Sequence, residues 1–108
     1  MLFRSSVLVP AYSASKGGVA QLTKALSNEW AAEGINVNAI APGYMATALT
    51  DTMKVKNPAQ YEETTRRIPM GRWGTAEDLK GLAVFLASDA SAYISGAVIP
   101  VDGGFLGR

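Results

Sequence analysis

The stretch Gly34-Ile35-Asn36-Val37-Asn38-Ala39-Ile40-Ala41-Pro42-Gly43 decides the fold. Residues 35–41 are few, β-branched and largely apolar, which is the pattern of a parallel strand covered on both faces. Pro42 and Gly43 end that strand sharply and place residues 44–47 at its carboxyl end. Ligands of open α/β sheets bind at that edge. The stretch therefore predicts an α/β fold with a ligand site just after the strand.

A long helix is predicted before this strand. Residues 13–33 carry one apolar stripe at helical spacing, which comprises Val19, Leu22, Leu26 and Trp30. Gly34 follows at the C-cap position, where a residue must tolerate a positive φ. Gly17 and Gly18 lie inside the helix, each at a cost of about 1 kcal/mol relative to alanine. Close approach of a backbone or ligand and ordinary helix packing explain these two glycines equally well.

A second helix and a second strand follow further along the chain. Thr75 is a good N-cap, and the acidic residues 77 and 78 suit the positive end of a helix that runs to about residue 88. The buried face of this helix is expected to comprise Leu79, Leu82, Ala83 and Leu86. Residues 97–101 have the composition of another buried strand, with Pro100 at a position that needs no ladder donor.

Residues 48–73 have a weaker pattern. Short helical turns are possible at 48–54 and 58–67, and a long segment of this kind at the ligand edge suggests a lid over the substrate. Five basic residues face three acidic ones there: Lys54, Lys56, Arg66, Arg67 and Arg72 against Asp51, Glu62 and Glu63. An anionic substrate and a solvated surface both account for this excess of positive charge.

Composition narrows the chemistry. The chain has 108 residues, 48% of them hydrophobic and 18% charged, which predicts a single globular domain with no linker or repeat. A net charge of +1 gives no electrostatic case for nucleic acid or a membrane surface. Cysteine and histidine are absent, so thiolate and ordinary zinc sites, and triads built on histidine, are excluded. No metal is expected, and the catalytic choices are Tyr, Lys, Ser and carboxylates.

The beginning of the chain imitates a secretory signal only weakly. Its apolar centre is residues 7–9, and Pro10 interrupts it. No apolar run approaches the roughly 20 residues that a membrane span needs. We therefore expect a cytoplasmic protein.

Tyr12-Ser13-Ala14-Ser15-Lys16 is the strongest chemical pattern. A tyrosine and a lysine four residues apart lie on one face of a helix. The phenol has an ordinary pKa of about 10, which a nearby ammonium lowers. Such a pair can act as the general acid/base that a carbonyl oxygen needs as it becomes an alcohol, or the reverse. A solvated helical pair, worth a few tenths of a kcal/mol, is the alternative.

Several motifs occur together in an order that resembles the C-terminal half of a short-chain dehydrogenase/reductase, from Val9 onward. They are the Tyr-x-x-x-Lys of residues 12–16, the strand and Pro-Gly of residues 36–43, Thr47 in Pro-Gly-x-x-x-Thr, Arg72-Trp73-Gly74, Ser95-Gly96 and residues 101–104. Within that family the chain is most similar to the gluconate and 2-deoxygluconate type of sugar-acid dehydrogenase, through residues 41–47 and Gly104-Phe105-Leu106.

The resemblance implies a Rossmann-like, doubly wound parallel sheet, of which residues 1–108 form a single incomplete domain. It implies an oxidoreductase that uses NAD or NADP to interconvert a secondary alcohol and a ketone, with sugar acids among the candidate substrates. A homo-oligomer, dimer or tetramer, is implied as well. The implied catalytic residues are Tyr12 and Lys16, with Pro42, Gly43 and Thr47 joining them at the cofactor and Tyr44 and Arg72 at the substrate.

The departures from the family pattern concern its N-terminal part. No Gly-x-x-x-Gly-x-Gly or Gly-x-Gly-x-x-Gly turn occurs, and the family's catalytic asparagine and serine have no match, since Ser5 and Ser6 lie too close to Tyr12. We therefore expect a partial family member that is inactive alone. The alternative is a non-catalytic fragment that acts only through the family's subunit-interface surfaces, one of which is the helix with Tyr12 and Lys16. The choice of NAD or NADP, the substrate and the reaction direction stay open.

Overall fold

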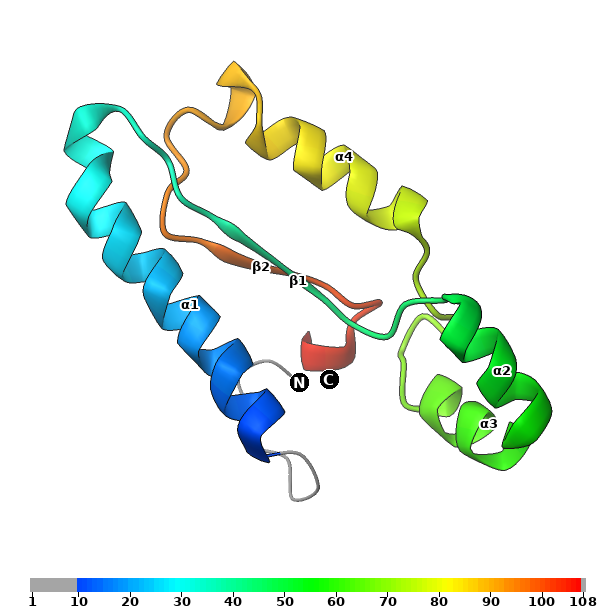
Figure 1. The fold of residues 1–108 in the computed structure, drawn as a ribbon. Helices are drawn as coiled ribbons and strands as arrows, with labels where there is room; N and C mark the ends of the chain where they lie inside the picture. Colours follow the sequence, from blue (N-terminus) through cyan, green and yellow to red (C-terminus); the bar gives the residue numbers. More distant parts are fainter. Residues whose placement is uncertain (1–9, 108) are drawn as a thin grey trace. The chain divides into compact units, whose positions relative to one another are not determined.

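The computed structural model describes residues 10–107, with side chains from residue 14 onward. Several helices separate the two strands along the chain (Figure 1). The order of the elements is α1 (Pro10–Trp30), η1 (Ala31–Glu33), β1 (Ala39–Pro42), α2 (Ala48–Lys56), α3 (Pro58–Arg66), α4 (Ala76–Leu86), η2 (Asp89–Ser91), β2 (Val98–Val101) and η3 (Phe105–Gly107). Backbone bonds join Ala39 N–H to Ala97 O and Gly43 N–H to Val101 O. Because the paired residue numbers rise together along both segments, β1 and β2 form a parallel pair. The predicted α/β class is confirmed.

Contacts divide the chain into two compact units. The first contains residues up to 41 together with residues 82–99, and the second contains residues 42–81 together with residues from 100 onward. Both strands begin in the first unit and end in the second. The expectation of one incomplete domain over residues 1–108 stays a prediction.

The strand predicted at residues 35–41 begins later, at Ala39. Side chains take the place of the backbone ladder upstream of it, all within the first unit. Asn38 donates from Nδ2 to Ile94 O at 3.0 Å, and its Oδ1 accepts from Ala97 N–H at 3.0 Å. Val37 N–H donates to Ser95 Oγ at 3.1 Å. One backbone bond is also made there, from Gly96 N–H to Val37 O at 2.7 Å, but the strand itself begins only at Ala39.

The long helix buries small and polar side chains. Ala20, Thr23 and Ser27 are 6–7% exposed, whereas Val19 and Leu22 of the predicted apolar stripe are 52% and 55% exposed. Ser27 lies against the turn at residues 95–96, with 2.6 Å between its Oγ and that of Ser95. A Cβ on Gly96 would lie 3.1 Å from Ser27 Oγ, so only a small residue fits there. Within the predicted stripe Val19 and Leu22 are thus more than half exposed, whereas Leu26 is partly buried.

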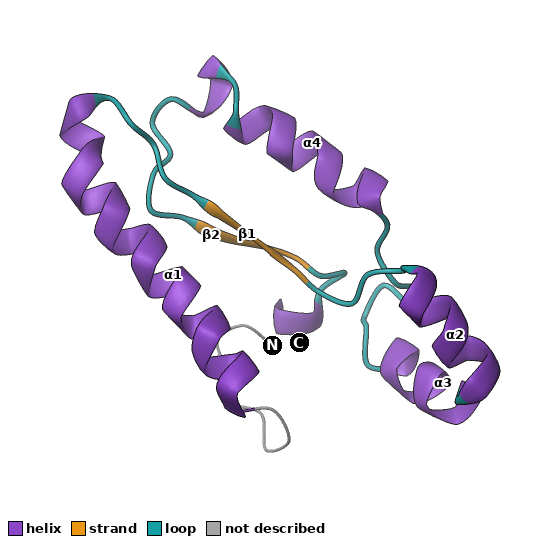
Figure 2. Cartoon of the chain, in the orientation of Figure 1, coloured by secondary structure: helices purple, strands orange, loops and turns teal. Residues whose placement is uncertain are grey.

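Figure 2 distinguishes the helices from the strands and loops of the chain, and residues typical of helix ends lie at several of the helix boundaries. Gly34 has φ 81° and ends the helical segment as predicted. The two short helices predicted in residues 48–73 are present, with Thr47 as the N-cap of α2 and Asn57 as the N-cap of α3. No residue of α4 is fully buried, so its predicted apolar face is only partly covered. Among the described residues nothing lies within 4 Å of a Cβ placed on Gly17 or Gly18, which leaves both explanations of those glycines open. The helices found in residues 10–107 are all too short or too polar to cross a membrane.

Candidate functional site

A cavity of about 350 Å³ lies in the second unit, at the carboxyl ends of β1 and β2. Its lining consists of Tyr44, Met70, Arg72, Gly74, Asp78 and residues 100–104. This is the sheet edge at which the sequence predicts a ligand site. Both residues predicted to contact substrate, Tyr44 and Arg72, line the same cavity.

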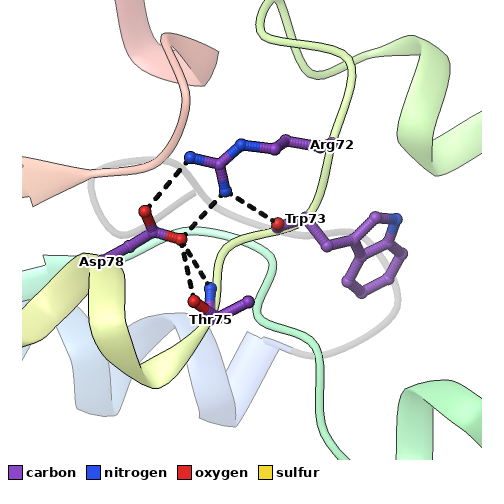
Figure 3. A network of polar contacts seen from close by, with 4 residues as sticks. All are labelled: Arg72, Trp73, Thr75 and Asp78. Atoms are coloured by element: carbon purple, nitrogen blue, oxygen red, sulfur yellow. Dashed lines mark hydrogen bonds and ion pairs between the residues drawn. The ribbon is translucent and has the colours of Figure 1, made fainter.

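One wall of the cavity is an ion pair. Arg72 binds Asp78 in the two-pronged geometry typical of arginine and carboxylate, with 2.9 Å from Nη1 to Oδ2 and 3.1 Å from Nη2 to Oδ1 (Figure 3). Oδ2 also accepts from Thr75 N–H at 2.8 Å, which is the capping-box contact that begins α4. Arg72 Nη1 donates in addition to Trp73 O at 3.2 Å. The predicted N-cap role of Thr75 therefore depends on the side chain of Asp78.

These contacts shift the pKa values of both groups of the pair. The hydrogen bonds from the Arg72 guanidinium, followed by the one from Thr75 N–H, hold the pKa of Asp78 well below its usual range. The hydrogen bond and charge of Asp78 raise the pKa of Arg72 in turn. Both groups are therefore ionised over the whole range in which an enzyme works.

An aromatic cluster supports the other wall. The ring of Tyr44 packs edge-on against Trp73, at 5.3 Å between centroids, and against Phe105, at 5.7 Å. Trp73 stacks in parallel on Tyr61, at 5.2 Å. Sequence reasoning used Trp73 and Phe105 only as parts of motifs and did not anticipate this cluster. No local signal in the sequence indicates this cluster, because its members are spread over positions 44, 61, 73 and 105.

The turn after β1 is tightly packed against the turn after β2. A Cβ on Gly43 would lie 2.6 Å from Asp102 Cβ, so no other residue fits there without movement. The carboxylate of Asp102 accepts from Gly104 N–H at 3.0 Å and from Leu106 N–H at 3.1 Å. Gly43 thus fixes how closely the two strand ends approach, in addition to its predicted place at a cofactor.

The remaining predicted site residues lie at helix ends or in α1. Thr47 is exposed, and its Oγ1 has only long contacts, 3.4 Å, to the backbone N and the hydroxyl of Thr50. Its hydroxyl can therefore still bind a ligand group at the N-terminus of α2. Pro42 is the exposed last residue of β1. Tyr12 and Lys16 lie one turn apart in α1, in the first unit, and the side chain of Tyr12 is outside the described part of the structure.

Two of the predicted cofactor-binding residues, Lys16 and Thr47, carry hydrogen-bond donors that a nicotinamide dinucleotide could use. The Thr47 hydroxyl and the Lys16 ammonium are groups that suit a carboxamide and a ribose. The glycine-rich turn that cradles a pyrophosphate has no match in the 108 residues. Each of these two side chains, taken by itself, thus has the chemistry that the nicotinamide end of such a cofactor needs.

Known proteins resemble the chain over nearly all of its length. A family described as Enoyl-(Acyl carrier protein) reductase matches residues 4–106. The 2-dehydro-3-deoxy-D-gluconate 5-dehydrogenase of Bacillus subtilis is 56% identical over 106 residues, and that of Pseudoalteromonas atlantica is 52% identical over 108 residues. These stretches make up 98% and 100% of this chain but 41% and 42% of the relatives, so the chain spans about two fifths of their length.

Solved structures resemble the chain in the same way as these sequences do. A protein from Agrobacterium tumefaciens, described as a 2-deoxy-D-gluconate 3-dehydrogenase with bound NADP, superposes with a TM-score of 0.91 at 54% identity, over 98% of this chain and 43% of that one. A protein from Beutenbergia cavernae, described as an NAD(P)-dependent gluconate 5-dehydrogenase, has a TM-score of 0.85 at 49% identity, over 96% of this chain and 44% of that one. The chain therefore belongs to the short-chain dehydrogenase/reductase family, and it corresponds to a C-terminal portion of a family member.

Proposed function

We propose that this chain is the catalytic C-terminal part of an NAD(P)-dependent dehydrogenase that interconverts a secondary alcohol and a ketone in a sugar acid. The observation that carries the proposal is the 52–56% identity to 2-dehydro-3-deoxy-D-gluconate 5-dehydrogenases over all or nearly all of the chain. The cavity at the strand ends supports it, because residues 44 and 72 lie where a substrate would bind. The substrate class is thus a hydroxylated carboxylate.

The proposed mechanism assigns each residue one role. Tyr12 gives a proton to the substrate oxygen as a ketone becomes an alcohol and takes it back in the other direction. Lys16 lowers the pKa of that phenol and binds the ribose hydroxyls of the cofactor. Thr47, together with the turn at residues 42–43, holds the nicotinamide end, and Tyr44 and Arg72 hold the substrate. The nicotinamide, when bound, supplies the hydride chemistry.

A chimera tests this function. It joins the N-terminal part of the Bacillus subtilis relative, up to the segment that this chain matches, to residues 1–108. The chimera is expected to reduce NAD or NADP with 2-dehydro-3-deoxy-D-gluconate, measured by the absorbance of the reduced nicotinamide. A folded chimera that binds NADP and turns over no sugar acid would overturn the proposal.

The second candidate function is interaction without catalysis. Val19 and Leu22 are more than half exposed on α1, an unusual place for two large aliphatic side chains. A homo-oligomer of the complete protein, or a hetero-oligomer of this chain with longer relatives, would cover them. Retention of the chain by immobilised Bacillus subtilis relative, without any change in that enzyme's turnover, would favour this function over the first.

The role proposed for Arg72 gives a first prediction. In the chimera, Arg72→Gln is expected to raise the KM for the sugar acid about tenfold or more, because a charge-assisted bond to the substrate carboxylate is lost. The KM for the corresponding neutral polyol should change much less. Arg66→Gln is the matched control, since Arg66 pairs with Glu63 at 3.3 Å on the surface and does not line the cavity.

Asp78→Asn separates substrate binding from support of the fold. This variant breaks the ion pair and keeps Arg72 at the cavity, so the ratio of the two KM values should stay near that of the parent. If Arg72→Gln raised both KM values equally, Arg72 would act only by supporting α4. Arg67, which lies over the Phe105 ring at 5.7 Å, can be tested in the same way.

The same ion pair predicts how stability depends on pH. Because the pKa of Asp78 is lower in the folded state than in the unfolded one, its contribution is complete above about pH 4 and is lost as the pH falls further. Asp78→Asn should therefore be less stable than the parent chimera at neutral pH, and this difference should narrow in acid. Urea unfolding by circular dichroism at a series of pH values measures it. A difference that is independent of pH would contradict the role of the ionised carboxylate.

A further inference from the structure

Trp73 connects parts of the second unit that are far apart in the sequence. Its side chain is buried, at 9% exposure. One face of the indole stacks on Tyr61 of α3, with an angle of 6° between the ring planes. Tyr44, which follows β1, meets the indole at 60°. The indole is thus the common neighbour of a lid helix and a residue that lines the cavity.

A hydrogen bond fixes the orientation of the indole. Trp73 Nε1–H donates to Thr65 Oγ1 at 2.7 Å. The same hydroxyl donates to Tyr61 O at 2.7 Å, one turn earlier in α3. Because the hydroxyl proton is used on the helix backbone, the Thr65 oxygen is free to accept from the indole. The position of Trp73 is therefore tied to that of α3.

The backbone around Trp73 holds Tyr44 as well. Gly74 N–H donates to Tyr44 O at 2.9 Å, and Ala46 N–H donates to Gly74 O at 2.7 Å. The ring of Tyr44 is in contact with Trp73 on one side and Phe105 on another. A displacement of the indole would consequently move the Tyr44 ring at the cavity.

We propose that Trp73 is a positioning residue that couples α3 to the cavity: through Thr65 and Tyr61 it sets the place of the Tyr44 ring, and with it the affinity for the sugar acid. The inference rests on the proposed function for the identity of the ligand. It adds to that function a route by which the lid segment determines substrate binding. Neither Trp73 nor Thr65 itself touches the reacting atoms in this scheme.

Thr65→Val in the chimera is the most direct test. Valine keeps nearly the shape of threonine and removes the acceptor of the indole N–H. We expect the KM for 2-dehydro-3-deoxy-D-gluconate to rise about three- to tenfold, as for one lost hydrogen bond, with kcat within about twofold. Trp73→Phe, which keeps an aromatic ring, should show the same split between KM and kcat.

Thr52→Val is the matched control. Thr52 makes the same bond to the residue four positions earlier, to Ala48 O at 3.2 Å, but on α2 and without a tryptophan partner. It should leave KM and kcat unchanged. A rise in KM for Thr52→Val equal to that for Thr65→Val would overturn the proposal, as would a loss for Thr65→Val that falls on kcat alone.

A spectroscopic measurement separates this inference from the proposed function. The chimera is labelled with 5-fluorotryptophan, and the Trp73 resonance is identified by its absence in Trp73→Phe. Addition of the sugar acid should shift this resonance, and Tyr44→Leu, which removes the ring between cavity and indole, should abolish the shift. A shift in a chimera without turnover would support the coupling while the proposed reaction failed. A resonance that ignores the ligand in an active chimera would overturn the coupling alone.

Discussion

The chimera with Tyr12→Phe is expected to lose about 10²- to 10⁴-fold in kcat, the usual effect of removing a general acid/base. Phenylalanine keeps the ring and removes only the oxygen that exchanges a proton with the substrate. Affinity for NADP should be almost unchanged, because the proposed mechanism assigns the substrate oxygen to the phenol and the ribose hydroxyls to Lys16. Stopped-flow turnover and cofactor titration by fluorescence measure the two quantities separately.

Tyr93→Phe is the matched control for this result. Tyr93 lies in the first unit as Tyr12 does, and it is fully exposed after η2. It should leave turnover and affinity as they are. Lys16→Ala should differ from both, since it is expected to weaken cofactor binding and to slow the reaction. Full activity in the Tyr12→Phe chimera would exclude the phenol as the acid/base.

Residues 1–108 alone are expected to be aggregated, oligomeric or molten, and to bind neither NAD nor NADP measurably. Among the described residues, the buried hydrophobic side chains are few: Ala20, Ala41, Ile68, Trp73 and Phe105. Each large apolar residue left in water forgoes about 1.5–3 kcal/mol, and a whole domain is stable by only about 5–15 kcal/mol. β1 and β2 pair only with each other in the described residues, so each also presents an open edge to other chains.

Sedimentation velocity and thermal unfolding test this expectation. The chimera is the control, because it contains the same residues and should melt cooperatively and be stabilised by NADP. A sharp melt of the isolated chain as a monomer would prove the expectation wrong. So would a saturable rise of its melting temperature with NAD or NADP.

The sequence was informative wherever a local signal decides the structure. Gly34 predicted the end of the long helical segment because only a residue tolerant of positive φ fits there, and its φ is 81°. The short helical turns predicted at 48–54 and 58–67 are present as α2 and α3, and each follows a residue whose side chain caps it. The family was also recognisable, because its motifs keep a fixed order along the chain.

The sequence was less informative where distant residues decide. Asn38 appears in the sequence as a strand residue, and nothing local reveals that its amide binds residues 94 and 97 and displaces the start of β1. Arg72 contributes to the excess of basic residues in the segment 48–73, whereas Asp78, the residue that it pairs with, lies outside that segment. The contact of Trp73 with Tyr44 likewise joins residues that are far apart in the sequence. It forms because the backbone at residues 73–74 packs beside the segment after β1, where Gly74 N–H donates to Tyr44 O.

The side-chain bonds of Asn38 also bear on register. Parallel strands have no hairpin that would set their alignment, and a slip by one residue turns every side chain to the opposite face. The Asn38 amide donates to one fixed carbonyl and accepts from one fixed N–H, three residues apart, so it accepts a single alignment of residues 38 and 97. The register of β1 and β2 is thus fixed by side-chain hydrogen bonds immediately upstream of the ladder. Any longer polypeptide that contains both segments therefore carries with it the side-chain bonds that set the alignment of the two strands.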